Sequence, residues 1–336
     1  IYNQFYSDLV TKVQHNIDVP NTIIHVFYAT KMGKKYEKRY YTYFKNPDIH
    51  RFNMQHEELF CCHANKWIEE VRNVVIGDVG LSKIDITGVS ETMLQTLYAR
   101  AKETNSQNAK IKDDIAVHIV ENIDYDFSKA DKDSAMSNGV IARTIVLDRM
   151  VEQYLNVHTN AVVVNIACGL DTRCYRMKGK YLRWYNLDLP QTMKIREQFL
   201  TETGPMYQIA KSAMDDSYIH DIEYHGEDIL VIIEGLTMYL DEKEVLKMFS
   251  IIEKSFKKVT VLVETMSPFV VKHMKEKSID QSNAKFLWGV KNGNELQKIL
   301  PEFIFEKEVS LIEGMKELHP IYHLFGWIPL VRNISN

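Results

Sequence analysis

Four short segments rich in apolar residues predict buried β-strands in the second half of the chain. They are Ala161–Ile166, Trp184–Asp188, Asp228–Glu234 and Val259–Glu264. Apolar side chains at consecutive positions, rather than at every second one, are typical of parallel strands that are covered on both faces. We therefore expect these segments to form the interior of a parallel sheet.

Helical patterns separate and precede these strands. Asp241 is a suitable N-cap for the segment that ends at Phe249, because acidic residues crowd the first turn that follows it. Strands that alternate with helices predict an α/β fold, a doubly wound, mostly parallel sheet with helices on both faces. A helical cap precedes the first strand, with predicted helices at Thr92–Glu103, Asp113–Ile123 and Asn138–Asp148.

The first part of the chain has a separate αβ pattern. Its predicted strands and helices are Thr22–Tyr28, Lys34–Phe44, Asp48–Phe52 and Trp67–Val75. Gly77, Gly80 and Gly88 follow this pattern and mark a break in regular structure. We therefore divide the chain into an N-terminal αβ segment, residues 1–76, and a larger domain, residues 77–336.

Composition limits the classes of partner. Apolar residues make up 45% and charged residues 26% of the 336 residues, a balance that supports a sizeable core. The net charge of −4 provides no overall positive field for nucleic acid. No apolar run reaches the ~18 residues of a membrane span, and the four cysteines have no C-x-x-C spacing. We expect reduced thiols and a cytoplasmic protein with neither nucleic-acid nor membrane partners.

The candidate chemistry lies at the ends of the first two predicted strands. The loop Asn165–Asp171 contains Gly169, where the backbone can approach a ligand closely. Asp188 ends the next strand, in the position of an acid that binds ribose hydroxyls. The glycines that seat a pyrophosphate are absent, which argues against a nicotinamide cofactor. S-adenosylmethionine fits better, because it has no pyrophosphate and its carboxylate can pair with Arg143.

Together these features resemble the leucine carboxyl methyltransferase family, which includes the tetracenomycin-type polyketide O-methyltransferases. The resemblance covers roughly residues 85–330 and implies a Rossmann-like, class I methyltransferase fold with S-adenosylmethionine as cofactor. The matching segments are Leu97–Ala101, Ile123–Phe127, Ala142–Thr144, Val164–Arg173, Trp184–Pro190 and Glu234–Leu240.

The resemblance implies roles for residues around the methionine portion of the cofactor. Arg143 would bind its carboxylate, and Arg100 would supply a second basic contact from the N-terminal helices. Gly169 and Asp171 would line the loop beneath it. Glu234, at the end of the third predicted strand, would be a further acid in contact with the cofactor.

The resemblance also assigns the nucleoside portion. Asp188 would hold the ribose, and Ser212 and Ala213 would border the adenine. Two positions depart from the family pattern. Ala167 replaces the first glycine of the loop, which reduces backbone freedom. Ser212 replaces an acid near the adenine, so that the adenine amine would be held by Asp215 or by the backbone.

Other polar residues near the loop keep more than one interpretation. Arg173 and Arg176 fit either the surface or the site. Cys168 is interpreted as a small packed residue, because no base or metal is placed to activate its thiol. His319 and His323 have the spacing of zinc ligands on a helix, but a proline lies between them and no glutamate accompanies them. We therefore expect no metal.

The expected reaction is in-line methyl transfer from the sulfonium of S-adenosylmethionine to an oxygen of a small-molecule, polyketide-like acceptor. A carboxylate acceptor is already anionic and needs no general base, whereas a hydroxyl acceptor needs one. The sequence identifies no such base, and the catalytic residues stay unassigned. The alternatives are methylation of a protein C-terminal carboxylate and non-catalytic binding of the cofactor. The oligomeric state is not determined by the sequence.

The N-terminal segment has a second resemblance. Residues 20–75 resemble the C-terminal end of an α/β-hydrolase, with His56 at the position of the triad histidine. A hydrolase of that kind also needs a serine on a G-x-S-x-G turn, which this sequence lacks. We therefore expect no hydrolytic activity.

Overall fold

The computed structural model describes residues 25–29, 48–52, 82–83, 89–273, 285–319 and 321–322. The chain divides into two compact units, Ile1–Gly80 and Leu81–Asn336. In the first unit, β1 (His25–Ala29) and β2 (Asp48–Phe52) pair in parallel. Strand β1 overlaps the predicted strand Thr22–Tyr28, and β2 coincides with the predicted strand Asp48–Phe52.

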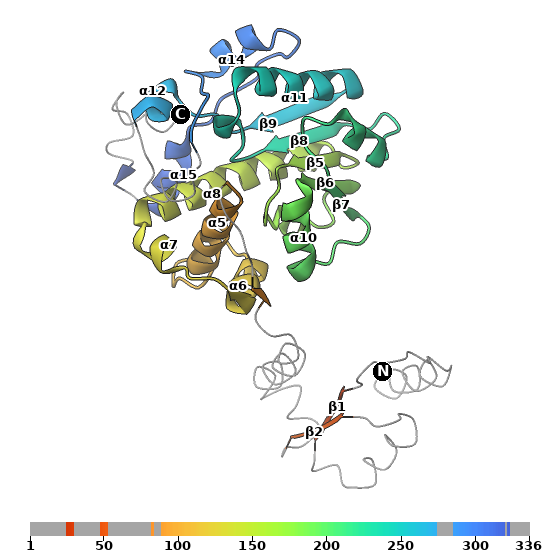
Figure 1. The fold of residues 1–336 in the computed structure, drawn as a ribbon, viewed down its shortest axis with the longest axis vertical. Helices are drawn as coiled ribbons and strands as arrows, with labels where there is room; N and C mark the ends of the chain where they lie inside the picture. Colours follow the sequence, from red (N-terminus) through yellow and green to blue (C-terminus); the bar gives the residue numbers. More distant parts are fainter. Residues whose placement is uncertain are drawn as a thin grey trace. The chain divides into compact units, whose positions relative to one another are not determined.

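The second unit is built on a parallel sheet in the order β7-β6-β5-β8-β9 (Figure 1). All four strands that the sequence predicts are present, and β7 was not predicted. Ile166, the last residue of β5, lies opposite Leu187 of β6 and Ile233 of β8, so the carboxyl ends of the central strands are level. The strands are β5 (Val162–Ile166), β6 (Arg183–Asp188), β7 (Met206–Ala210), β8 (Ile229–Ile233) and β9 (Val259–Val263).

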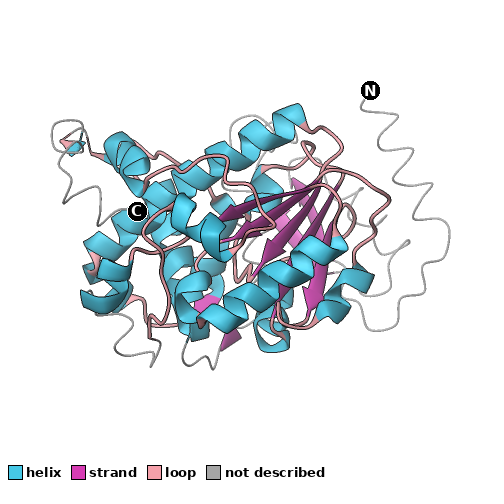
Figure 2. Ribbon diagram, turned by 90° about the horizontal axis from the view of Figure 1, so that it is seen from above, coloured by secondary structure: helices cyan, strands magenta, loops and turns pink. Residues whose placement is uncertain are grey.

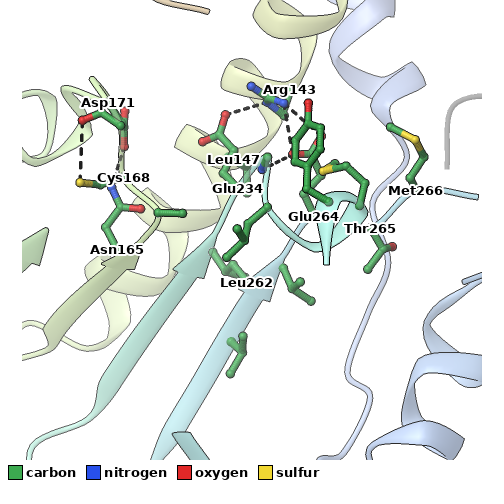
Figure 3. Close-up of a pocket in the computed structure, with 18 of the residues that line it drawn as sticks. Arg143, Leu147, Asn165, Cys168, Asp171, Glu234, Leu262, Glu264, Thr265 and Met266 are labelled. Carbon is green, nitrogen blue, oxygen red and sulfur yellow. Dashed lines mark hydrogen bonds and ion pairs between the residues drawn. The ribbon is translucent and has the colours of Figure 1, made fainter. Parts of the chain in front are cut away.

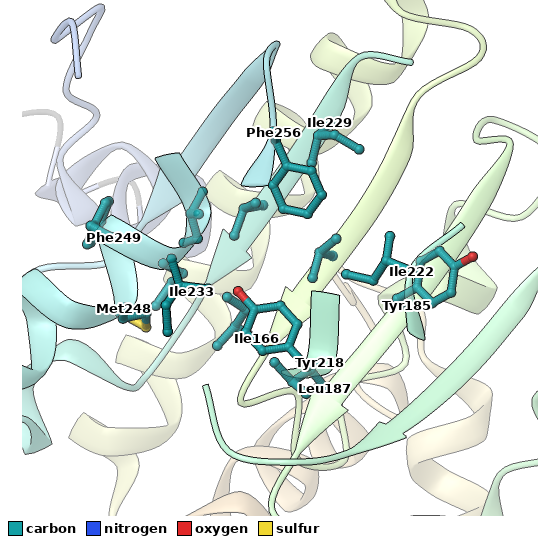
Figure 4. Close-up of a cluster of buried hydrophobic side chains, with 14 of the residues drawn as sticks. Ile166, Tyr185, Leu187, Tyr218, Ile222, Ile229, Ile233, Met248, Phe249 and Phe256 are labelled. Carbon is teal, nitrogen blue, oxygen red and sulfur yellow. The ribbon is translucent and has the colours of Figure 1, made fainter. Parts of the chain in front are cut away.

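Helices cover both faces of this sheet (Figure 2). Alternate side chains of β5 point to opposite faces, because the side-chain period of a strand is two residues. Val163 packs in the same cluster as Val151 of α8 (Ser134–Val157). Val164 packs in the same cluster as Phe249 of α11 (Glu242–Ser255). Figure 4 shows part of this hydrophobic cluster. The central strands β5 and β8 are completely buried as a result.

A helical cap precedes the sheet, as the sequence predicts. It comprises α5 (Val89–Thr104), α6 (Asp114–Asn122) and α7 (Ser128–Lys132), together with the short parallel pair β3 (Ser82–Lys83) and β4 (Ile123–Asp124). Helix α5 packs against both α6 and α8. The remaining helices are α9 (Arg173–Arg176), α10 (Pro190–Phe199), η2 (Asp216–Asp221), η3 (Thr237–Tyr239), α12 (Pro268–His273), α14 (Gly293–Ile299) and α15 (Leu311–Leu318).

Local sequence signals fix two features of this packing. The predicted N-cap Asp241 begins α11 with a capping box, since its side chain accepts the Glu244 amide at 2.9 Å and Glu244 accepts the Asp241 amide at 2.9 Å. Helix α15 packs closely on α8 at Gly314, where a Cβ atom would lie only 2.1 Å from the Ala142 carbonyl oxygen. Any larger residue at position 314 would force these two helices apart.

Candidate functional site

A cavity of about 1720 Å³ opens at the carboxyl ends of the sheet strands. A single ligand usually occupies a pocket of roughly 300–1,000 Å³, so this space is large enough for a cofactor and a second molecule. The residues that the sequence proposes for cofactor binding all line it. They are Arg100, Arg143, Gly169, Asp171, Asp188, Ser212, Ala213 and Glu234.

The loop after β5 makes a tight turn at the base of the cavity. Ala167 and Gly169 have φ angles of 54° and 48°, in the left-handed region. The amide of Cys168 donates to the carbonyl of Leu187 at 3.1 Å, which ties the loop to β6. A Cβ atom at Gly169 would lie 3.2 Å from the Met93 Cβ atom, so the loop also approaches α5 closely. The backbone of the loop therefore faces the cavity with little side chain in between.

Two arginines from different helices hold this loop. Arg196 of α10 donates from Nη1 to the Gly169 carbonyl at 2.8 Å. Arg100 of α5 donates from Nη2 to the Leu170 carbonyl at 2.8 Å, and it is 5% exposed. Arg100 therefore supports the loop directly, in addition to lining the cavity. The counter-ions of the two arginines are buried carboxylates, Glu202 and Asp113 respectively.

Asp188 is held at the end of β6 by two backbone amides. Gly169 donates to its Oδ2 at 2.8 Å and Leu189 donates to its Oδ1 at 2.7 Å. Burial raises the pKa of Asp188 above its ordinary value, although these amides and the Thr192 side chain act in the opposite direction. Each carboxylate oxygen can accept more than one hydrogen bond, so both can also receive a ligand hydroxyl.

Arg173 lies at the centre of a buried cluster of acids. Its Nε is 2.6 Å from Asp148, its Nη1 is 2.9 Å from Asp171 and its Nη2 is 2.9 Å from Glu234. The Arg173 side chain is only 1% exposed, so the surface interpretation that the sequence left open is wrong. Burial opposes ionisation of Glu234, but Arg173 and Arg143 lower the pKa of Glu234 below its ordinary value. Arg176 is partly buried too and pairs with Asp148 at 2.9 Å.

Arg143 lies between two glutamates at the ends of neighbouring strands (Figure 3). Its Nε is 2.7 Å from Glu234 Oε1, and its Nη1 is 3.2 Å from Glu264 Oε2. Glu264 also accepts the amide of Gly235 at 2.6 Å. Burial opposes the charge of Arg143, yet Glu264 and Glu234 raise the pKa of Arg143 above its ordinary value. Sequence reasoning missed Glu264 as a site residue, whose only signal is its position at the end of a predicted strand.

The other wall carries the residues proposed for the adenine. Ser212 and Ala213 line the cavity, and the Ser212 Oγ accepts the Met214 amide at 3.1 Å. Asp215 is exposed and accepts the Ser217 amide at 3.0 Å, where it caps η2. It is not among the residues that line the cavity. Of the two alternatives for the adenine amine, this arrangement favours backbone groups over Asp215.

Apolar and aromatic side chains also form part of the lining of the cavity. The rings of Tyr239 and Phe286 have centroids 5.6 Å apart. No histidine lines the cavity within the described part of the chain. Burial raises the pKa of the Cys168 thiol well above its ordinary value, as suits a packed residue and not a nucleophile. Further apolar lining residues are Leu147, Met238, Met266 and Tyr322.

His56 and His323 lie outside the described residues. The same holds for Gly77, Gly80 and Gly88 and for the predicted helices Lys34–Phe44 and Trp67–Val75. Within the described residues, no group of three or more histidine, cysteine, aspartate or glutamate side chains is arranged to hold a metal. No helix in that part of the chain has both the length and the apolarity needed to cross a membrane.

Comparison with known proteins points to one family. Residues 93–253 match the leucine carboxyl methyltransferase family. The tetracenomycin polyketide synthesis O-methyltransferase TcmP of Streptomyces glaucescens is 29% identical over 233 residues, which cover 69% of this chain and 86% of TcmP. The S-adenosyl-L-methionine-dependent methyltransferase dpfgK of Gibberella zeae is 28% identical over 268 residues, which cover 73% of this chain and 89% of dpfgK.

Solved methyltransferase structures align with smaller parts of the chain. A SAM-dependent methyltransferase from Anabaena variabilis aligns with a TM-score of 0.38 and 12% identity, over 51% of this chain and 74% of that one. Human N-acetylserotonin methyltransferase, in complex with SAM, aligns with a TM-score of 0.34 and 9% identity, over 62% of this chain and 59% of that one.

Proposed function

Because this chain belongs to the leucine carboxyl methyltransferase family and is a methyltransferase with S-adenosylmethionine as its cofactor, we propose that it methylates an oxygen of a small molecule. The observation that carries this proposal is the lining of the cavity. Charged residues that suit the cofactor lie at the ends of β5, β6 and β8, and apolar and aromatic side chains, among them Tyr239 and Phe286, line the same cavity. The relative TcmP is a polyketide O-methyltransferase by name, which supports an acceptor of similar character.

The proposed cofactor contacts follow the order of the strands. Asp188 would accept hydrogen bonds from the ribose hydroxyls, with its two oxygens already fixed by backbone amides. Gly169 and Asp171 would lie beneath the methionine portion. Arg143 would pair with the methionine carboxylate, and Glu234 would face its amine. The cofactor supplies an activated methyl group, which leaves the protein to bind, orient and exclude water.

The remaining proposed contacts complete the two ends of the cofactor. Ser212 and Ala213 would border the adenine on the cavity wall. Arg100 would act mainly through the loop, since its guanidinium is bonded to the Leu170 carbonyl and to Asp113. Ser212 and Ala213 would thus contact the ligand itself, whereas Arg100 would fix the backbone of the loop that the ligand contacts.

The lining of the cavity favours an acceptor that is already anionic. A hydroxyl acceptor must lose a proton, and histidine is the side chain that most often takes it. The described lining of the cavity contains no histidine, and Glu234 and Glu264 are both engaged in ion pairs with Arg143. A carboxylate acceptor needs no base at neutral pH. We therefore propose that the acceptor group is a carboxylate and not a hydroxyl.

Two measurements test this function. Calorimetry should detect binding of S-adenosylhomocysteine and no binding of NAD. Transfer of labelled methyl from S-adenosylmethionine should then be compared between an aromatic carboxylic acid and the alcohol of the same ring system. We expect methyl ester from the acid and at least tenfold less ether from the alcohol. Preferential methylation of the alcohol would contradict the carboxylate assignment, and methylation of short peptides only would favour a protein carboxyl terminus as acceptor.

We assign this activity to residues 77–336 and a cytoplasmic location to the protein. The second unit, Leu81–Asn336, contains every residue of the proposed site. Its two described cysteines, Cys168 and Cys174, are buried free thiols, which fits a reducing compartment. A chain that begins at residue 77 should remain folded and bind S-adenosylhomocysteine. Loss of folding in that chain would show that the first segment covers apolar surface of the second.

A further inference from the structure

Glu264 directly follows β9, the strand that pairs with β8 in the sheet, and Glu234 directly follows β8. Ile233 of β8 is opposite Val263 of β9, so Glu234 and Glu264 leave the sheet side by side. Asp188 leaves the sheet on the opposite side of β5, at the end of β6. Along the carboxyl edge, the order is therefore Asp188, the glycine loop, Glu234 and Glu264. In this order, Glu264 lies on the far side of Glu234 from Asp188, the residue that we assign to the ribose.

Four contacts fix Glu264 in this position. Its amide donates to the Ile233 carbonyl at 2.8 Å, and its own carbonyl accepts the Thr237 hydroxyl at 2.7 Å. Its side chain accepts the Gly235 amide at 2.6 Å and Arg143 Nη1 at 3.2 Å. The side chain is 23% exposed, so it also faces the cavity. The carboxylate therefore joins three structural elements, which are β9, the turn after β8 and α8.

The two side-chain contacts of Glu264 reach Arg143 and the turn that directly follows Glu234, and we assign both Arg143 and Glu234 to the methionine portion of the cofactor. Gly235 has a φ angle of 65° and directly follows Glu234, so its left-handed conformation turns the chain immediately after that glutamate. Arg143 is held at Nη1 by Glu264 and at Nε by Glu234. Among the charges that raise the pKa of Arg143, Glu264 has the largest effect. Glu264 therefore contributes, together with Glu234, to both the direction and the neutralisation of the arginine that we assign to the cofactor carboxylate.

We propose that Glu264 is a positioning residue of the methyl-transfer site, which fixes Arg143 and the Gly235 turn and favours the sulfonium form of the cofactor. This inference rests on the cofactor contacts proposed above. S-adenosylmethionine carries a positive sulfonium, and S-adenosylhomocysteine carries a neutral thioether in its place. A carboxylate near the methyl end attracts the positively charged sulfonium but not the neutral thioether. After methyl transfer that attraction is lost, which assists release of the product.

Replacement with glutamine separates the charge of Glu264 from its hydrogen bond. In Glu264→Gln, the amide oxygen can still accept the Gly235 amide, but the negative charge is gone. We expect the affinity for S-adenosylmethionine, relative to that for S-adenosylhomocysteine, to fall about three- to tenfold, with the melting temperature of the unliganded protein close to that of the parent. Glu264→Ala should show the same change in the ratio and a further loss of kcat, because the Gly235 turn is released as well.

The control is Glu317→Gln. Glu317 of α15 pairs with Arg149, which lies on the same helix as Arg143, and neither residue lines the cavity. The ratio of the two affinities should not change in this variant. A ratio in Glu264→Gln equal to that of the parent would overturn the role of Glu264 alone. Equal weakening of both ligands would likewise overturn it, as a purely structural effect. Failure of the parent to bind either ligand would overturn the proposed function and this inference together.

Discussion

Replacing Arg173 with methionine should cost the protein a large part of its stability. The Arg173 side chain is 1% exposed, and its three nitrogens each face a different carboxylate, those of Asp148, Asp171 and Glu234. Methionine has a similar length and fills the space, but it has no charge. The change would therefore leave acids in a buried site with fewer cations to balance them.

The loss of stability in Arg173→Met depends on which arginines still pair with each acid. Removal of one partner from a buried ion pair costs about 3–5 kcal/mol. Here Asp148 keeps Arg176 at 2.9 Å, and Glu234 keeps Arg143 at 2.7 Å. We therefore expect the lower end of the range, about 3 kcal/mol, out of a total free energy of unfolding of about 5–15 kcal/mol.

The effect should also depend on pH with a definite sign. Burial opposes ionisation of Asp148, Asp171 and Glu234, but the arginines lower the pKa of each below its ordinary value of 3.8, 3.8 or 4.5. Groups with a lowered pKa in the folded state stabilise the fold above their unfolded pKa, and they lose that contribution as the pH falls through the folded pKa. The cost of Arg173→Met should therefore be greatest near pH 7 and shrink below about pH 4.

Urea unfolding of the parent and the variant at several pH values measures this cost. Arg149→Met is the matched control, because Arg149 pairs with Glu317 at the surface and should contribute at most about 1 kcal/mol. A loss below 1 kcal/mol for Arg173→Met at pH 7, or a loss that does not change with pH, would refute the reasoning.

Three smaller changes test other parts of the site. Asp188→Ala should weaken S-adenosylhomocysteine binding by about 1–3 kcal/mol, since ribose hydroxyls lose a charged acceptor; unchanged affinity by calorimetry in a folded variant would reject that role. Arg143→Lys should weaken the same binding, because lysine cannot replace a planar fork, while the melting temperature without ligand stays near that of the parent; collapse of the unliganded variant would mark Arg143 as structural instead. Ala167→Gly should raise the free energy of unfolding by about 0.5–1 kcal/mol, because the φ angle of 54° suits glycine, unless urea unfolding shows that the packing of the alanine methyl contributes more.

Local sequence patterns were sufficient where neighbouring residues carry the information. Strands β5, β6 and β8 are buried along most of their length and β9 is partly buried, and the apolar runs of all four are visible without any tertiary contact. The same is true of Asp241, whose capping box lies within four residues. The loop around Gly169 follows from the position of small residues after a strand, and the whole predicted cofactor set lines one cavity because parallel strands end at one edge.

Local patterns failed where the signal is weak or has two meanings. Strand β7 (Met206–Ala210) lies at the sheet edge, with buried and exposed residues mixed, and no apolar run marks it. Pro190 begins α10, a helix start that our sequence analysis did not identify. Proline suits the first turn of a helix, because the amide that it lacks would have no partner there.

The electrostatic design of the site was decided only by the tertiary structure. Arg173 is 61 residues away from Glu234 in sequence, and Arg143 is 121 residues away from Glu264. Each pair meets because α8, the β5 loop and the ends of β8 and β9 come together once the sheet has formed. Charged residues in a sequence look alike whether they face water or one another, since their burial depends on segments elsewhere in the chain. The sequence by itself therefore determined the parallel sheet and the position of the Gly169 loop and of Asp188 at its carboxyl edge, whereas the buried position of Arg173 and the contacts of Glu264 depended on packing.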